Sequence, residues 1–119
     1  MITKSSIQIR KATEKHIRQV KAIADANKES IGFVLRPALI EAVQRGELLV
    51  AVTRNGRVLG FVNYHHRRDD QTTIYEICVK AVHRGKGLGR RLIEAVKTEV
   101  REKGKRRIRL KCPVSLDAN

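Results

Sequence analysis

The clearest chemistry in the sequence lies in a basic, glycine-rich stretch, which reads His83-Arg84-Gly85-Lys86-Gly87-Leu88-Gly89-Arg90-Arg91. Glycines let the backbone turn sharply and approach a ligand closely, because they have no Cβ. Amides at the start of the helix expected to follow lack partners within that helix, and together with the positive end of its dipole they suit a pyrophosphate. Additional positive charge comes from Arg84, Lys86, Arg90 and Arg91. We therefore predict an anion site from Arg84 to Gly89, with a plain turn carrying solubilising charges as the alternative.

The spacing of this stretch excludes two common nucleotide-binding motifs. It is not a P-loop, since no Lys-Ser or Lys-Thr follows the last glycine. It is not a dinucleotide fingerprint either, because its glycines follow a G-x-G-x-G pattern and the strands before it look antiparallel. Cys78 and Cys112 have no CxxC spacing, so we expect neither a metal site nor a disulfide framework and interpret both as small buried side chains.

Three side chains are candidates for acid-base chemistry. Glu76 stands in the apolar run from Ile74 to Val79, where partial burial would raise its pKa toward the range of a general base. A carboxylate that faces solvent or pairs with an arginine would explain it equally well. His65 and His66 precede two arginines, a pattern more typical of a polar strand end than of a base or a substrate contact.

Hydrophobic patterning predicts an α/β (α+β) fold with a mostly antiparallel sheet. The expected elements are a strand from Ile7 to Arg10, helices from Thr13 to about Lys28 and from Pro37 to Gly46, strands over 48–52, 57–66 and 72–79, a helix from Leu88 to Gly104, and a strand from Arg106 to Cys112. Asn55-Gly56 predicts a tight hairpin, so the three consecutive strands should run antiparallel. With 119 residues and 41% hydrophobic content, residues 1–119 suit a single domain.

The charge is strongly positive, with 26 Lys and Arg against 12 Asp and Glu and a formal net charge of +14. Such a surface attracts anions, among them nucleic acid, acidic membranes and phosphorylated cofactors. The first residues lack the apolar run of a signal peptide or membrane span, so we expect a cytoplasmic protein that does not bind membranes. Only 3% of residues are aromatic, which leaves little for a platform on which bases stack.

Two segments together resemble the signature of the GNAT N-acetyltransferase family. They are Glu76-Ile77-Cys78-Val79 and Arg84-Gly85-Lys86-Gly87-Leu88-Gly89-Arg90-Arg91-Leu92-Ile93. In that family Arg or Gln-x-x-Gly-x-Gly or Ala follows the fourth strand, and the expected element order here is similar. The resemblance implies a mostly antiparallel mixed sheet flanked by helices, acetyl-CoA as cofactor, and acetyl transfer to a primary amine of a small-molecule or peptide acceptor by direct attack in a ternary complex.

The resemblance also implies roles for individual residues. The cofactor's pyrophosphate would be held by Arg84, Gly85, Lys86, Gly87, Leu88, Gly89 and Arg90. Main-chain groups of Ile77, Cys78 and Val79 would pair with the pantetheine arm as an added strand does, and an amide near Cys78 or Val79 would stabilise the oxyanion. The fourth and fifth strands would splay apart around the thioester. Glu76 is the leading candidate for the general base.

The end of the sequence departs from the family pattern. GNAT domains usually continue after the fifth strand with a helix and two strands, and a tyrosine in that part protonates the thiolate. Here Ser115-Leu116-Asp117-Ala118 has Ser where Asn is common, and the sequence stops at Asn119. We therefore expect a C-terminally incomplete domain whose general acid lies beyond Asn119, and a homo-oligomer formed through an exposed sheet edge.

Two other functions stay open. Basic residues gather late in the sequence, at Arg101, Lys103, Lys105, Arg106, Arg107, Arg109 and Lys111. They favour a nucleic-acid-binding module with salt-dependent affinity. A GNAT-like domain that binds acyl-CoA without turnover is the second alternative, because the tyrosine position is absent.

Overall fold

The protein folds around one five-stranded sheet in a computed structural model that describes residues 6–111. The strands are β1 (Ile7–Lys11), β2 (Leu48–Thr53), β3 (Val58–His66), β4 (Gln71–Val79) and β5 (Arg107–Leu110), and they lie in this order across the sheet. The first four are antiparallel neighbours, whereas β5 runs parallel to β4. The predicted mixed, mostly antiparallel sheet is confirmed.

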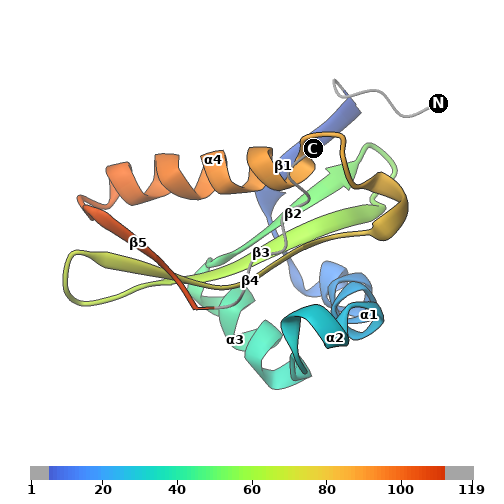
Figure 1. Ribbon diagram of the computed structural model, residues 1–119, viewed down its shortest axis with the longest axis horizontal. Helices are drawn as coiled ribbons and strands as arrows, with labels where there is room; N and C mark the ends of the chain where they lie inside the picture. The colour runs from blue at the N-terminus through green and yellow to red at the C-terminus, as the bar shows by residue number, and fades with distance from the viewer. Residues whose placement is uncertain (1–5, 112–119) are drawn as a thin grey trace.

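Helices cover both faces of the sheet (Figure 1). On one face lie α1 (Ile17–Ala26), α2 (Lys28–Ile31) and α3 (Arg36–Arg45), and on the other lies α4 (Leu88–Glu102). Short 3-10 turns precede α1 and α4, at Glu14–His16 and Ala81–His83. The sequence predicted one helix from Thr13 to Lys28, but Asn27 interrupts it with φ −121° and donates its side-chain amide to Ile23 O at 2.8 Å.

Two hydrophobic clusters, one on each face, hold the helices against the sheet. Val50 and Phe61 point to the side of α1 and α3, while Val62 and Ile74 point to the side of α4, as the alternation of side chains along a strand requires. Leu92 and Val96 of α4 are completely buried in the second cluster. Burying one such side chain stabilises the fold by about 1.5–3 kcal/mol, so the packing fixes α4 relative to β4.

A bulge in β4 disturbs this alternation. Asn63 pairs with Glu76 and Tyr64 with Ile74, so Tyr75 has no opposite residue on β3. Ile74 and Ile77 both belong to the cluster under α4, and the two residues between them therefore face the side of α1 and α3. The bulge thus brings Tyr75 and Glu76 onto the same face.

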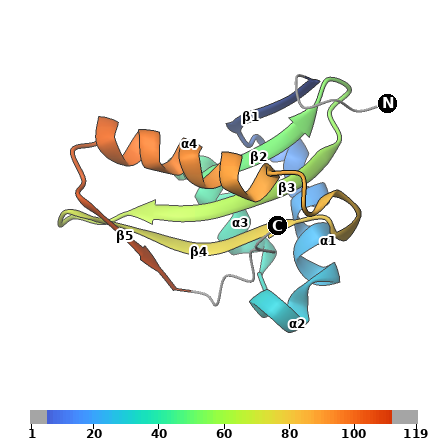
Figure 2. The same ribbon diagram turned by 45° about the horizontal axis from the view of Figure 1, so that its top comes forward.

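Strands β4 and β5 separate after a short paired section (Figure 2). Pairing runs from Gln71 with Arg107 to Ile74 with Leu110, and the Lys111 amide donates to Ile74 O at 2.9 Å. Beyond that point β4 continues to Val79, and no other described strand pairs with this side of it. β5 is shorter than the predicted strand, and Cys112 lies outside the described residues. Leu110 of this strand is 52% exposed.

Candidate active site

The glycine-rich loop leads directly into α4 and forms a cradle of main-chain donors. Gly85 and Gly87 have φ of 78° and 82°, a conformation that side chains with a Cβ rarely adopt. No side chain caps α4, and within residues 6–111 the amides of Leu88, Gly89 and Arg90 have no main-chain acceptor. The first amide with such an acceptor is that of Arg91, bonded to Gly87 O at 3.0 Å. These donors at the positive end of a helix dipole suit an anion.

The basic side chains of this loop divide into two groups. Lys86 and Arg90 are exposed and form no ion pair with any described residue. Arg84 instead braces the loop, because its Nε donates to Val79 O at 3.1 Å and its guanidinium also bonds Asn27 Oδ1. Arg91, which the sequence predicted beside the anion, donates to Ile7 O of β1 at 2.7 Å. That side chain therefore anchors α4, which corrects the expectation.

The unpaired part of β4 presents main-chain groups toward the gap. The Lys80 amide donates to Leu59 O at 2.8 Å, so the main-chain groups of Lys80 face β3. In an antiparallel ladder the main-chain groups of residues two positions apart face the same neighbouring strand, so those of Cys78 face β3 as well. Ile77 and Val79 then face away from β3. Of the three predicted pantetheine contacts, the register thus directs the main chain of Ile77 and Val79 outward and that of Cys78 toward β3.

Glu76 lies at the bulge, at the start of this unpaired section. Its side chain is partly buried, and burial raises the pKa of its carboxyl, although the hydrogen bond that Asn63 Nδ2 donates at 2.8 Å opposes this shift. No ion pair to Glu76 occurs within residues 6–111. A carboxylate of this kind accepts protons nearer neutral pH than an exposed one does.

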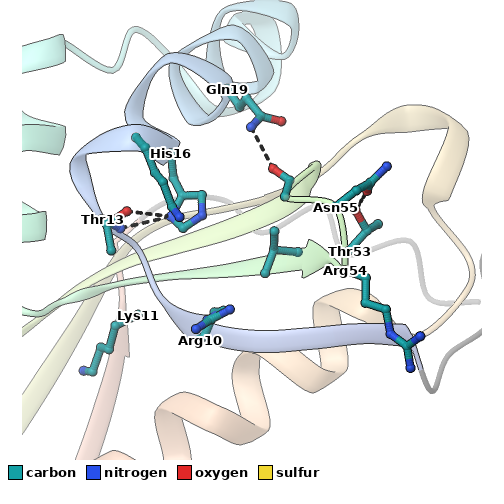
Figure 3. Close-up of a pocket in the computed structure, with 11 residues that line it drawn as sticks. Arg10, Lys11, Thr13, His16, Gln19, Thr53, Arg54 and Asn55 are labelled. Carbon is teal, nitrogen blue, oxygen red and sulfur yellow. Dashed lines mark hydrogen bonds between the residues drawn. The ribbon is translucent and has the colours of Figure 1, made fainter.

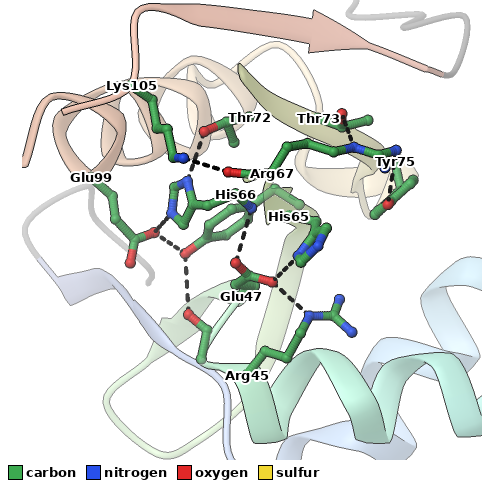
Figure 4. Close-up of polar contacts among 12 residues, drawn as sticks. Arg45, Glu47, His65, His66, Arg67, Thr72, Thr73, Tyr75, Glu99 and Lys105 are labelled. Atoms are coloured by element: carbon green, nitrogen blue, oxygen red, sulfur yellow. Dashed lines mark hydrogen bonds and ion pairs between the residues drawn. The ribbon is translucent and has the colours of Figure 1, made fainter. Parts of the chain in front are cut away.

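His65 and His66 are half-buried members of a polar network at the end of β3 (Figure 4). His65 Nδ1 lies 2.7 Å from Glu47 Oε1, and Glu47 also accepts hydrogen bonds from Arg45 Nε at 2.6 Å and from the His66 amide at 3.0 Å. Burial acts to raise the pKa of Glu47, but these hydrogen bonds lower it overall. The carboxylate therefore stays ionised and orients His65.

The second half of the network connects His66 to the opposite helix. His66 Nδ1 lies 2.7 Å from Thr72 Oγ1, and its Nε2 lies 3.5 Å from Glu99 Oε2. Glu99 also accepts hydrogen bonds from Tyr64 and Lys11. Sequence reasoning missed Glu47 and Glu99, because the contacts that place them in this network are with residues far along the chain, 18 positions from Glu47 to His65 and 35 from Glu99 to Tyr64. The local sequence around Glu47, a glycine before it and an apolar run after it, does not indicate its contact with His65.

The sequence of residues 18–119 matches the Acetyltransferase (GNAT) family, and the chain belongs to this family. No curated protein matches the sequence significantly. Within residues 6–111, no helix combines the length and the apolar character needed to cross a membrane.

Solved structures share the fold at low sequence identity. The Mycobacterium tuberculosis protein Rv2747, in complex with CoA and NLQ, is 23% identical with a TM-score of 0.79, over 87% of this chain and 63% of its own. Ard1 from Thermoplasma volcanium is 22% identical with a TM-score of 0.79, over 95% and 76%. The PaiA N-acetyltransferase from Thermoplasma acidophilum, in complex with coenzyme A, is 16% identical with a TM-score of 0.78, over 94% and 82%. The chain thus spans less than two thirds of the first of these proteins.

Proposed function

We propose that this chain transfers an acetyl group from acetyl-CoA to a primary amine of a small-molecule or peptide acceptor, by direct attack in a ternary complex. The observation that carries the proposal is the donor cradle at the start of α4, next to the unpaired section of β4. Similar structures were solved with CoA or acetyl-CoA, which supports the choice of cofactor. Both hydrophobic clusters share one sheet, which supports a single domain.

The residues present fit the two polar parts of CoA. In the cradle from Arg84 to Arg90, the amides of Leu88, Gly89 and Arg90 lack main-chain partners within residues 6–111 and suit a diphosphate, with Lys86 and Arg90 as mobile cations. The outward main-chain groups of Ile77 and the outward amide of Val79 suit an amide-containing arm lying along β4, whereas Val79 O already accepts from Arg84. Cys78 is buried in the cluster on the side of α1 and contributes packing beneath that arm.

Glu76 is the proposed general base. When bound, acetyl-CoA would supply the acetyl group as a thioester, whose C–S bond breaks as the N–C bond forms. CoA would leave as a thiolate and take up the proton that the nitrogen loses on becoming an amide. A primary amine is mostly protonated at neutral pH, so the ionised Glu76 carboxylate must take a proton before the nitrogen can attack. Asn63 holds that carboxylate through its Nδ2 hydrogen bond. The outward amide of Val79 is a donor for negative charge that develops on the carbonyl oxygen.

Calorimetry with CoA, combined with an acetyl-transfer assay over a panel of amines, tests the proposal. We expect CoA binding that persists in 0.5 M salt, because main-chain donors in a fixed cradle are screened less than mobile surface charges, and transfer to at least one amine. CoA binding without transfer to any amine would favour the non-catalytic alternative. Absence of CoA binding would overturn the assignment.

The late basic residues supply the observation behind the second candidate function. Exposed side chains line the end of α4 and β5, namely Arg101, Lys103, Arg106, Arg107, Arg109 and Lys111. A short RNA is the probe in a parallel titration, and binding that disappears between 50 and 200 mM salt would support a nucleic-acid interface.

β5 is the last strand in the described sheet, and its exposed Leu110 is the basis for a proposed homo-oligomer. Size-exclusion chromatography with light scattering should give a mass above that of one chain, and a stable monomer at micromolar concentration would count against it.

A further inference from the structure

A second basic recess lies at the other end of α1, at the edge strand β1. The hollow has a volume of about 400 Å³ and is enclosed by β1, the segment before α1 and the hairpin between β2 and β3 (Figure 3). Arg10 reaches it from the strand, Lys15 and His16 from the segment before α1, and Arg54 from the hairpin. Two stretches of chain far apart in the sequence, residues 10–19 and 52–56, thus place Arg10, Lys15 and Arg54 around the same space.

The positive charge of this hollow is not neutralised by the protein. None of the residues that line it is acidic. Arg10, Lys15 and Arg54 form no side-chain hydrogen bond or ion pair with another described residue. Lys11, by contrast, forms an ion pair with Glu99 of α4. Uncompensated like charges around one recess repel each other, and an anion between them would relieve that repulsion.

His16 adds an oriented donor to the cations. The residue is only 5% exposed, and its Nδ1 accepts a hydrogen bond from the Thr13 amide at 3.0 Å. The neutral ring therefore carries its proton on Nε2, which is a donor. Burial first, and then the charges of Lys15 and Arg10, lower the pKa of His16. Lys15 and Arg10 thus lie close enough to His16 to disfavour its charged form.

Gln19 fixes the far wall of the hollow. Its Nε2 donates to Gly56 O at 3.0 Å, and its Oε1 accepts from the Val58 amide at 2.8 Å. These two hydrogen bonds join α1 to the hairpin that carries Arg54. The wall is therefore positioned by the fold and does not depend on a ligand.

The hollow is separate from the cradle at α4. Gln19 lies near the start of α1, whereas Asn27, which follows its last residue, contacts Arg84 of the cradle. Gln19 and Asn27 are eight positions apart along this helix, which corresponds to about 12 Å along the axis. Strands β2 and β3 also lie between β1 and β4. No residue of the cradle lines the hollow.

We propose that this hollow is a second anion site, which binds a small phosphorylated ligand through Arg10, Lys15, Arg54 and the Nε2 proton of His16. Phosphate oxygens match this arrangement, because guanidinium groups form strong, paired hydrogen bonds to them and the histidine supplies a further donor. The site does not depend on acetyl transfer, and its ligand is an addition to the cofactor in the cradle.

Pyrophosphate and inorganic phosphate are the probes, and histidine NMR is the readout. His16 reports on the hollow, while His83 stands in the loop before the cradle and reports on that region. We expect saturable shifts of the His16 ring signals with pyrophosphate, and a smaller affinity for phosphate because it carries less charge. CoA, as the third ligand, should shift His83 and leave His16 unchanged.

Arg54→Gln and Arg18→Gln form a matched pair of variants. Each removes one exposed arginine, but Arg18 does not line the hollow. Arg54→Gln should weaken pyrophosphate binding at His16 about tenfold, as the loss of one charge-assisted contact predicts, and Arg18→Gln less than about twofold. Equal weakening by both variants, no shift of His16 with pyrophosphate, or a shift with CoA alone would overturn the proposal.

Discussion

The cradle at the start of α4 and the hollow beside β1 both attract anions, but they are built in different ways. The cradle is one contiguous stretch from Arg84 to Arg90 whose donors are main-chain amides. The hollow uses side chains from β1, from the segment before α1 and from the β2–β3 hairpin. A site made of backbone leaves a glycine spacing in the sequence, whereas a site made of distant side chains exists only in the folded chain.

The largest expected difference is that acetyl transfer takes place beside the cradle and not at the hollow, and the variant Glu76→Gln tests it. The variant keeps a hydrogen-bond acceptor for Asn63 but cannot take a proton, so the rate of acetyl transfer should fall about 10²- to 10⁴-fold. Affinity for CoA and for pyrophosphate should not change. Steady-state kinetics and calorimetry give the two quantities.

Glu102→Gln is the matched control, because Glu102 is exposed at the end of α4 and forms no ion pair with a described residue. A Glu76→Gln protein with the wild-type rate would show that another group accepts the proton, and His65 beside Glu47 would be tested next.

A second variant, Gly87→Val, tests whether the cradle depends on its backbone. Gly87 has φ 82°, so a valine forces the loop out of the conformation that directs the amides of α4. Losing two hydrogen bonds of about 1 kcal/mol each would weaken CoA binding about thirtyfold. Pyrophosphate binding in the hollow, read from His16, should stay the same.

Gly46→Val is its control, since Gly46 has φ 70° at the end of α3 and no atom within 4 Å of where a Cβ would be. Both variants should lose about 1–2 kcal/mol of stability from the left-handed backbone conformation. Equal CoA affinity in the two would rule out the cradle.

The contrast between local and distant signals also explains what the sequence could predict. The hairpin at Asn55-Gly56 and the helix from Leu88 are encoded by neighbouring residues, and both are confirmed. The partly buried position of Glu76 was predictable from the apolar run around it. Its bulge was not, because the extra residue Tyr75 appears only once β3 and β4 are paired.

Side-chain partners were the least predictable feature. Arg91 looked like a phosphate ligand by its position, yet it bonds to Ile7 across 84 positions of sequence. The sequence alone assigned no role to Arg10, Lys15 and Arg54, since no local pattern shows that a hairpin will bring Arg54 beside the other two. A tertiary contact of this kind is decided by packing, and propensity and periodicity carry no information about it.

Gln19→Ala is expected to affect only the hollow. Without the Gln19 side chain, the buried Val58 amide loses its acceptor, which costs about 1–3 kcal/mol of stability. The hairpin with Arg54 also loses its tether to α1, so pyrophosphate affinity should fall a few-fold while CoA affinity stays constant. Thermal melts measure the stability, and the NMR titration measures the affinity for pyrophosphate.

Gln44→Ala on the exposed side of α3 is the control. A loss of CoA affinity in Gln19→Ala would show that the two sites are coupled.

The smallest expected effect is the pH dependence of the hollow. The pKa of His16 is lowered in the folded protein, so the unfolded chain binds the proton more readily and stability falls as pH drops below about 6.5 through the folded value. A bound anion should raise this pKa, so pyrophosphate should bind more tightly at pH 6 than at pH 8 and should offset part of the acid destabilisation.

His83 is the internal reference for this measurement, because burial and the charges of Lys86, Lys80 and Arg57 lower its pKa as well. If CoA raises the pKa of His83 and pyrophosphate that of His16, the regions are independent. If either ligand moves both values equally in the Gly87→Val protein as well as in the wild type, the effect is general screening of a cationic surface, and the hollow is not a site.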